Sequence, residues 1–140
     1  MSERWRFFLL GYLWSLPNTL AGLLIAIAYR PTSIRWRRGR IECLSSRIWW
    51  RPGAQTLGIV VYYSTERARD DAGLVHHEWT HVVQALIGGP LFALAYGLCH
   101  CYLWLRLGDF RAAYDRNPFE VQAYRHQAEL LASRKAQRSS

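Results

Sequence analysis

The segment that decides the fold is residues 71–90, DAGLVHHEWTHVVQALIGGP. Its apolar residues recur at the spacing of one helix face, namely Leu74, Val75, Val82, Ala85 and Leu86. Either Asp70 or Asp71 can cap the start of a helix here, and the run Gly88-Gly89-Pro90 ends it. We therefore expect a single helix that carries the motif His77-Glu78-Trp79-Thr80-His81 in its middle.

The two histidines of this motif are four residues apart, which places them one turn apart on the same helix face. Both imidazoles can therefore bind one Zn²⁺ ion. Glu78 then lies beside the metal, where it can accept a proton from a bound water molecule. The alternative interpretation is a solvated helix face that carries two histidines and a glutamate without any metal.

A catalytic zinc ion usually has three protein ligands and one position for water, so a third ligand is expected downstream. The candidates are His100, Asp115, Glu120 and His126. We prefer Glu120, because the segment Asn117-Pro118-Phe119-Glu120 begins a separate helix that can present the carboxylate rigidly. The alternative is a capping box, in which Asn117 is the N-cap and Glu120 occupies the third helical position. The sequence leaves both interpretations open.

Upstream, residues 7–29 form a run of 23 residues without a charge. This length is enough for a helix that crosses a bilayer, and Trp5, Trp14 and Trp36 lie near plausible positions of a membrane interface. We expect a membrane-inserted or anchoring helix over residues 1–30. The alternatives are a cleaved signal peptide, a buried core helix, and a hairpin broken at Pro17-Asn18.

The chain of 140 residues has a net charge of +8, and seven arginines follow the uncharged run between Arg30 and Arg51. The positive-inside rule then places everything after Tyr29 in the cytoplasm. The same cluster is expected to contact anionic lipid head groups, whereas nucleic acid is a less favoured partner. An odd count of three cysteines indicates reduced thiols, and Cys99 and Cys101 diverge too far on a helix to hold a second metal.

The remaining segments complete an α+β fold of one domain, since 140 residues with 51% hydrophobic content leave no room for a second module. Short strands on either side of Gly39, over 46–50 and over 57–63 predict a small antiparallel sheet, with 57–63 as its strongest strand. Residues 91–107 predict a core or membrane-surface helix, and a polar loop over 108–116 leads to the last helix. We expect a folded domain over residues 31–132 and a polar tail over 133–140.

These features resemble the gluzincin branch of zinc metallopeptidases, in which HExxH is followed by a helix-borne glutamate. More closely, four segments resemble a group of short bacterial proteins regarded as membrane metallopeptidases: Thr56-Leu57-Gly58, residues 77–84, Gly89-Pro90-Leu91-Phe92 and Asn117-Pro118-Phe119-Glu120. The resemblance implies a minimal zincin-like fold and hydrolysis of a peptide or protein substrate. It also implies that His77, His81 and Glu120 bind zinc and that Glu78 is the catalytic base.

One position departs from the gluzincin pattern, because Tyr124 replaces the aspartate that many members use to orient a zinc-binding histidine. We expect the Tyr124 hydroxyl or a backbone carbonyl to take over that role. Tyr114, Tyr124 and His126 are candidates to stabilise the transition state. A chain this short has little material for a substrate cleft, so a non-catalytic zinc protein is the second hypothesis. No sequence feature indicates an oligomeric state.

Overall fold

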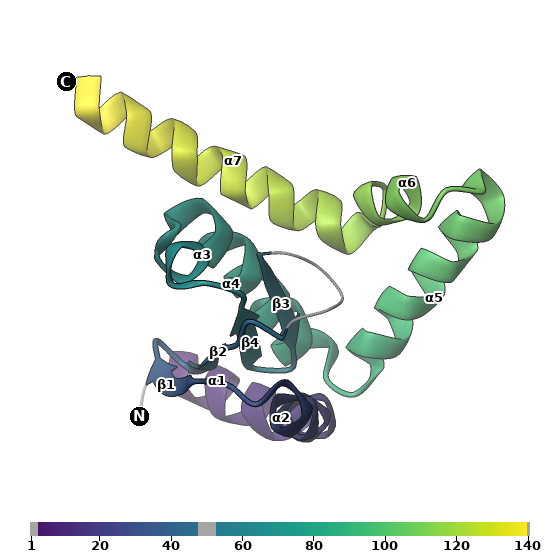
Figure 1. Ribbon diagram of the computed structural model, residues 1–140, viewed down its shortest axis with the longest axis horizontal. Coiled ribbons are helices and arrows are strands. Elements are labelled where there is room, and N and C mark those ends of the chain that lie inside the picture. The colour runs from purple at the N-terminus through teal and green to yellow at the C-terminus, as the bar shows by residue number, and fades with distance from the viewer. Residues whose placement is uncertain (1–2, 48–52, 140) are drawn as a thin grey trace.

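The computed structural model describes residues 3–47 and 53–139, and side chains within 9–47 and 53–138 (Figure 1). The α+β fold class is confirmed. The described elements follow one another as α1 Glu3–Trp14, α2 Leu16–Tyr29, β1 Ser33–Arg37, β2 Arg40–Leu44, β3 Ala54–Leu57, β4 Val60–Tyr63, α3 Glu66–Asp70, α4 Ala72–Gly88, α5 Leu91–Leu107, α6 Phe110–Asp115 and α7 Pro118–Ser139.

The four strands form one sheet in the order β1-β2-β4-β3. The pairs β1–β2 and β3–β4 are antiparallel hairpins, and the first turns at Arg38-Gly39 as expected from the glycine. Strands β2 and β4 run parallel, with Ile41 opposite Val60. The prediction of an antiparallel sheet is therefore wrong at this pair. The chain returns from β2 through the edge strand β3, so the hairpin that follows brings β4 back alongside β2 in the same direction.

The strand predicted over 57–63 is two strands, because the chain turns between Leu57 and Val60. Gly58 has a φ of +62°, and a Cβ there would lie 2.5 Å from the backbone nitrogen of Thr19 in α2. Close packing of α2 against this turn thus requires glycine and ends β3. Of the strand predicted over 46–50, Ser46 and Arg47 form a turn, and the rest lies outside the described residues.

The uncharged N-terminal run folds as two helices rather than one, with the break at Ser15 and Pro17 in the first turn of α2. Helix α2 covers one face of the sheet, where Ala26 and Tyr29 pack with residues of β2 and β4. Within residues 3–47 and 53–139, no single helix is long and apolar enough to cross a membrane. Helices α4 and α5 are long and apolar enough for this only when taken together, and the chain bends by 115° between them.

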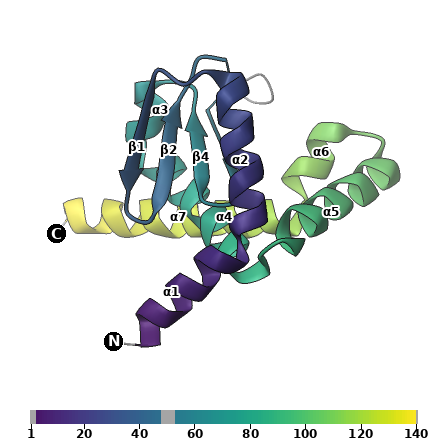
Figure 2. The ribbon, with the colours of Figure 1, turned by 90° about the horizontal axis from the view of Figure 1, so that it is seen from below.

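Helix α4 covers the other face of the sheet, as Figure 2 shows. Val82 and Leu86 of α4 are buried against Ile59, Val61 and Tyr63. The predicted cap is confirmed at Asp71, whose side chain accepts a hydrogen bond of 2.8 Å from the Leu74 amide. The central helix is thus fixed between the sheet on one side and α7 on the other.

Two predictions about the C-terminal third are wrong. The segment expected to be a polar loop contains α6, which Asp109 caps by accepting hydrogen bonds from the amides of Arg111 and Ala112. The segment expected to be a polar tail continues α7 as far as Ser139, although its side chains are exposed. Its Ala, Arg, Lys and Gln residues favour helix without needing burial.

Candidate metal centre

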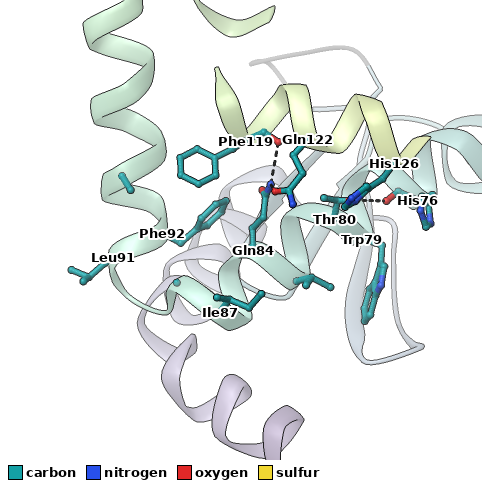
Figure 3. Close-up of a pocket in the computed structure, with 13 residues that line it drawn as sticks. His76, Trp79, Thr80, Gln84, Ile87, Leu91, Phe92, Phe119, Gln122 and His126 are labelled. Atoms are coloured by element: carbon teal, nitrogen blue, oxygen red, sulfur yellow. Dashed lines mark hydrogen bonds between the residues drawn. The ribbon is translucent and has the colours of Figure 1, made fainter. Parts of the chain in front are cut away.

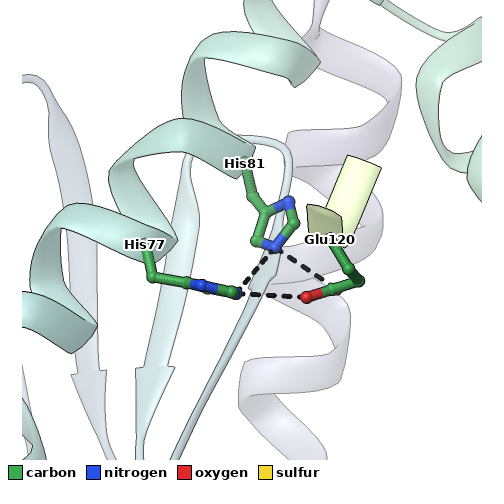
Figure 4. A group of neighbouring side chains, drawn as sticks. All are labelled: His77, His81 and Glu120. Atoms are coloured by element: carbon green, nitrogen blue, oxygen red, sulfur yellow. Dashed lines mark hydrogen bonds and ion pairs between the residues drawn. The ribbon is translucent and has the colours of Figure 1, made fainter. Parts of the chain in front are cut away.

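Three side chains from two helices converge at the contact between α4 and α7 (Figure 4). His77 and His81 come from the middle of α4, and Glu120 comes from the first turn of α7. The two Nε2 atoms lie 3.2 Å apart. Glu120 lies 3.1 Å from the Nε2 of His77 through Oε2, and 3.3 Å from that of His81 through Oε1. All three residues are buried.

These distances fit the ligand set of one tetrahedral ion. Zinc binds histidine nitrogen and carboxylate oxygen at about 2.0–2.1 Å, so two tetrahedral ligand atoms lie roughly 3.3 Å apart. The three ligand atoms also lie within 4.8 Å of one another in every combination, and they offer two imidazole nitrogens and one carboxylate oxygen. The residues therefore form a group that can hold a metal ion. Of the predicted candidates, the structure brings together His77, His81 and Glu120.

Glu120 points into this group rather than back toward its own helix terminus. The hydroxyl of Tyr96 in α5 donates a hydrogen bond of 2.7 Å to Oε1, and that of Tyr114 in α6 donates to Oε2. Asn117 has the capping role, because its side-chain oxygen accepts from the Phe119 amide. Burial opposes ionisation of Glu120, but hydrogen bonds with His77 and His81 hold its pKa well below the ordinary range.

Gln84 orients His81, and the sequence analysis did not identify it. Its Oε1 atom lies 2.8 Å from the Nδ1 atom of His81. Its amide nitrogen donates to the Phe119 carbonyl and to the Gln122 side chain, both on α7. Burial tends to lower the pKa of His81, but contacts with Glu120, Glu78 and Gln84 raise it overall. The signal available in the sequence was the three-residue spacing from His81, which puts Gln84 on the same helix face.

His77 is held differently. The ring of Tyr124 packs against its imidazole with the centroids 4.5 Å apart and an angle of 63° between the planes. The Nδ1 atom of His77 is buried and has no hydrogen-bond partner among the described side chains and backbone. The expected hydrogen bond from the Tyr124 hydroxyl or a carbonyl is therefore not found there, and Tyr124 acts by ring packing.

Glu78 is buried on α4 and faces the sheet edge. The hydroxyl of Thr56 in β3 donates a hydrogen bond of 2.7 Å to its Oε2 atom. Strand β3 pairs with β4 on one side and is an edge of the sheet among the described residues, so the Glu78 carboxylate is held beside an edge strand. Thr56 is the second residue that the sequence analysis did not assign to the site. The turn at Gly58 was not predicted, so the strand that contains Thr56 was not recognised.

The other candidates lie away from the ligand group. The Nδ1 atom of His126 lies 3.3 Å from the Thr80 hydroxyl, beside a cavity of about 610 Å³ between α4, α5 and α7 (Figure 3). His76 lines the same cavity. His100 packs on Phe110, and Asp115 pairs with Arg111. Within the described part of the chain, the metal-ligand groupings include neither Cys99 nor Cys101.

The arginine cluster divides between the interior and the surface. Arg35 and Arg40 bind the buried carboxylate of Glu42 at 2.6 Å each, and Arg40 also lies over the ring of Trp79. The arginines left exposed are Arg30, Arg37, Arg38 and Arg47, and Arg51 lies outside the described residues. Fewer arginines of the predicted lipid-binding cluster are therefore exposed than the sequence alone suggests.

Known proteins do not assign this site. Comparisons with models of protein families, with curated proteins and with solved structures find no match to the chain. The geometry and chemistry of the side chains are therefore the basis for a functional assignment.

Proposed function

We propose that the protein is a zinc-dependent metallopeptidase with His77, His81 and Glu120 as ligands and Glu78 as the general base. The observation that carries this proposal is the convergence of two Nε2 atoms 3.2 Å apart with the Glu120 carboxylate, whose Oε2 lies 3.1 Å from His77 and whose Oε1 lies 3.3 Å from His81. Structural zinc sites usually contain four cysteine or histidine ligands, whereas three ligands with a nearby carboxylate are typical of hydrolytic sites. The resemblance of the HExxH motif to gluzincins points the same way.

The residues of the chain have separate tasks in the proposed reaction. Zinc held by His77, His81 and Glu120 would supply Lewis-acid chemistry for the water and the scissile carbonyl. Glu78 accepts the proton of the attacking water and then donates it to the leaving amine, while Thr56 holds its carboxylate in place. Gln84 keeps the Nε2 atom of His81 aimed at the ligand group.

The edge strand β3 supports a peptide as the substrate. Its outer side has no neighbouring strand among the described residues, and antiparallel addition of an extended peptide would continue the sheet. Thr56 links this strand directly to Glu78, so a peptide paired with β3 would pass the general base. Residues Tyr114 and Tyr124 surround the ligands and remain candidates for contacts with the reacting group.

The first experiment measures bound metal by elemental analysis in the purified wild type and in Glu78→Gln, His81→Ala and Glu120→Ala. We expect about one zinc per chain in the wild type and in Glu78→Gln, and none in the two ligand variants. His76→Ala is the matched control, because this neighbouring histidine lines the cavity instead of the ligand group. A peptide library then tests cleavage, which Glu78→Gln should abolish.

Burial of the ligands favours a second candidate function, a zinc site that stabilises the fold without catalysis. His77 and Glu120 are each only 3% exposed, which leaves little room for a substrate at the metal. Zinc retained without any peptidase activity, together with a loss of thermal stability in His81→Ala, would support this function. Absence of zinc after reconstitution would refute both candidates.

A further inference from the structure

Exposed apolar side chains gather where two breaks in the helical chain meet. One break separates α1 from α2, and the other is the corner between α4 and α5. We call this region the corner surface and define it as Leu13, Trp14, Leu16, Leu20, Ile87, Leu91 and Leu94, which are 45% to 69% exposed. Soluble monomers rarely expose many large apolar side chains in one place.

Contacts between distant residues join the two breaks. The side-chain amide of Asn18 donates a hydrogen bond of 2.6 Å to the Gly89 carbonyl. Gly89 has a positive φ, and a Cβ there would lie 2.1 Å from the indole nitrogen of Trp14. Gly11 of α1 likewise lies against Leu86 of α4. The break between α1 and α2 therefore lies beside the corner between α4 and α5 (Figure 2).

Helix α5 extends the corner surface along its outer side. Leu98, Tyr102 and Leu105 continue the stripe begun by Leu91 and Leu94, and they are 60% to 83% exposed. The inner side of the same helix contains the packing residues, since Phe92 is buried and Tyr96 contacts Glu120. Most of the surface of the outer stripe is therefore left uncovered by the described part of the chain.

The charges around this surface indicate its partner. No charged residue occurs over residues 7–29 or 91–105, and an exposed arginine follows each run, at Arg30 and Arg106. Trp14 and Tyr102 supply amphipathic rings of the type enriched at membrane interfaces. An uncharged apolar surface bordered by arginines complements a bilayer with anionic head groups.

We propose that the corner surface and the outer stripe of α5 bind an anionic lipid bilayer, with the helices lying in the interface. Helices of 12, 14 and 17 residues are shorter than the roughly 30 Å of a hydrocarbon core, and each contacts protein on its inner side. The proposal concerns a surface separate from the metal ligands and does not depend on the proposed peptidase activity.

The test is flotation of the full chain with vesicles of phosphatidylcholine, with and without phosphatidylglycerol. We expect binding to both kinds of vesicle, with stronger binding when phosphatidylglycerol is present. Leu94→Glu and Leu98→Glu should each weaken binding about tenfold or more, because a buried leucine contributes roughly 1.5 kcal/mol or more. Arg30→Gln combined with Arg106→Gln should remove most of the preference for phosphatidylglycerol.

The matched controls are Val121→Glu and Leu131→Glu, two apolar residues of α7 that are 51% and 48% exposed and lie outside the surface. These variants should bind vesicles like the wild type. Equal binding by Leu94→Glu and wild type would overturn the proposal. Sedimentation equilibrium provides a second test, since a dimer that Leu94→Glu dissociates, without vesicle binding, would assign the surface to a second copy. Zinc content measured on the same samples separates this result from the metal proposal.

Discussion

Helices α4 and α5 each have 17 residues and follow one another in the chain, yet they distribute polar and apolar residues in opposite ways. Helix α4 buries four polar residues within five positions: His77, Glu78, Thr80 and His81. Helix α5 buries only Phe92 among its large apolar residues and exposes leucines along its outer side. Both arrangements invert the usual partition between core and surface.

The difference teaches where each helix obtains its stabilising contacts. Buried polar groups are costly unless they are hydrogen-bonded, and those of α4 meet partners from β3 and α7. The exposed leucines on α5 bury little of their surface against the described part of the fold. This difference is consistent with α4 as the helix of the metal-ligand group and with the binding surface that we propose on α5.

The largest expected effect is the difference in stability between a leucine substitution in α4 and one in α5. Leu86 in α4 is 2% exposed, whereas Leu98 in α5 is 61% exposed. Leu86→Ala should lower the free energy of unfolding by about 3–4 kcal/mol, because it leaves a cavity against the sheet. Leu98→Ala should change it by less than about 0.5 kcal/mol. Urea unfolding followed by circular dichroism measures both values, and comparable losses would contradict the exposed position of the α5 stripe.

The next effect is a loss of stability when the buried carboxylate of Glu42 in the sheet is removed. Glu42 is buried between Arg35 and Arg40, and Arg40 lies over Trp79 of α4. Glu42→Gln should destabilise the fold by about 2–3 kcal/mol, because it leaves the buried Arg40 without its counter-charge. Arg47→Gln serves as the control, since this arginine is exposed and should leave stability nearly unchanged.

The same residue gives a pH dependence of known sign. Burial tends to raise the pKa of Glu42, but hydrogen bonds and charges from both arginines bring it below the ordinary value of 4.5. A lowered pKa in the folded state contributes stability that is complete above pH 4.5 and is lost as the pH falls through the folded pKa. Acid titration should therefore destabilise the wild type more steeply than Glu42→Gln. Parallel pH curves would show that the pair does not hold the ionised form.

A smaller effect is expected from the residue that links α4 to α7. Gln84→Ala removes the partner of His81 Nδ1 and should weaken zinc affinity about 10- to 100-fold. Gln122→Ala removes a neighbour of Gln84 without touching the histidine, so its affinity should stay close to wild type. Competition with a chromophoric chelator measures both affinities. Equal affinities for all three proteins would remove Gln84 from the site.

The smallest effect uses the inner side of α5. Tyr96→Phe removes one hydroxyl from Glu120 and should weaken zinc affinity about fivefold, since one hydrogen bond to a charged group is lost. Tyr102→Phe, on the outer side of the same helix, should leave it unchanged. The same chelator competition applies, and an effect of Tyr102→Phe equal to that of Tyr96→Phe would show that α5 does not act through its inner side.

Features encoded by local spacing were predictable from the sequence. The cap at Asp71, the extent of α4, and the shared face of His77 and His81 depend on residues within a few turns. The position of Glu120 beside the two histidines needed the structure, since the same residues also form a capping pattern, and only contact with α4 places its carboxylate in the group that can hold a metal ion.

Features that depend on distant contacts were not predictable. The turn at Gly58 exists because Thr19, some 40 residues earlier, packs against it. The parallel pairing of β2 with β4 depends on which edge the chain reaches, a choice that strand propensities do not encode. The break near Pro17 was among the alternatives that the sequence left open, but the packing of the two helices on the sheet and on Gly89 depends on distant contacts.

The hydrogen bond between Asn18 and Gly89 joins residues that are 71 positions apart. Synthesis proceeds from the N-terminus, so the apolar segments of α1 and α2 are made well before the corner that holds them. Closing so long a loop also costs more chain entropy than forming a local contact. The nascent chain therefore passes through a stage in which α2 can pack on the sheet but its contact with the corner has not yet formed, so this contact belongs to a late step of assembly.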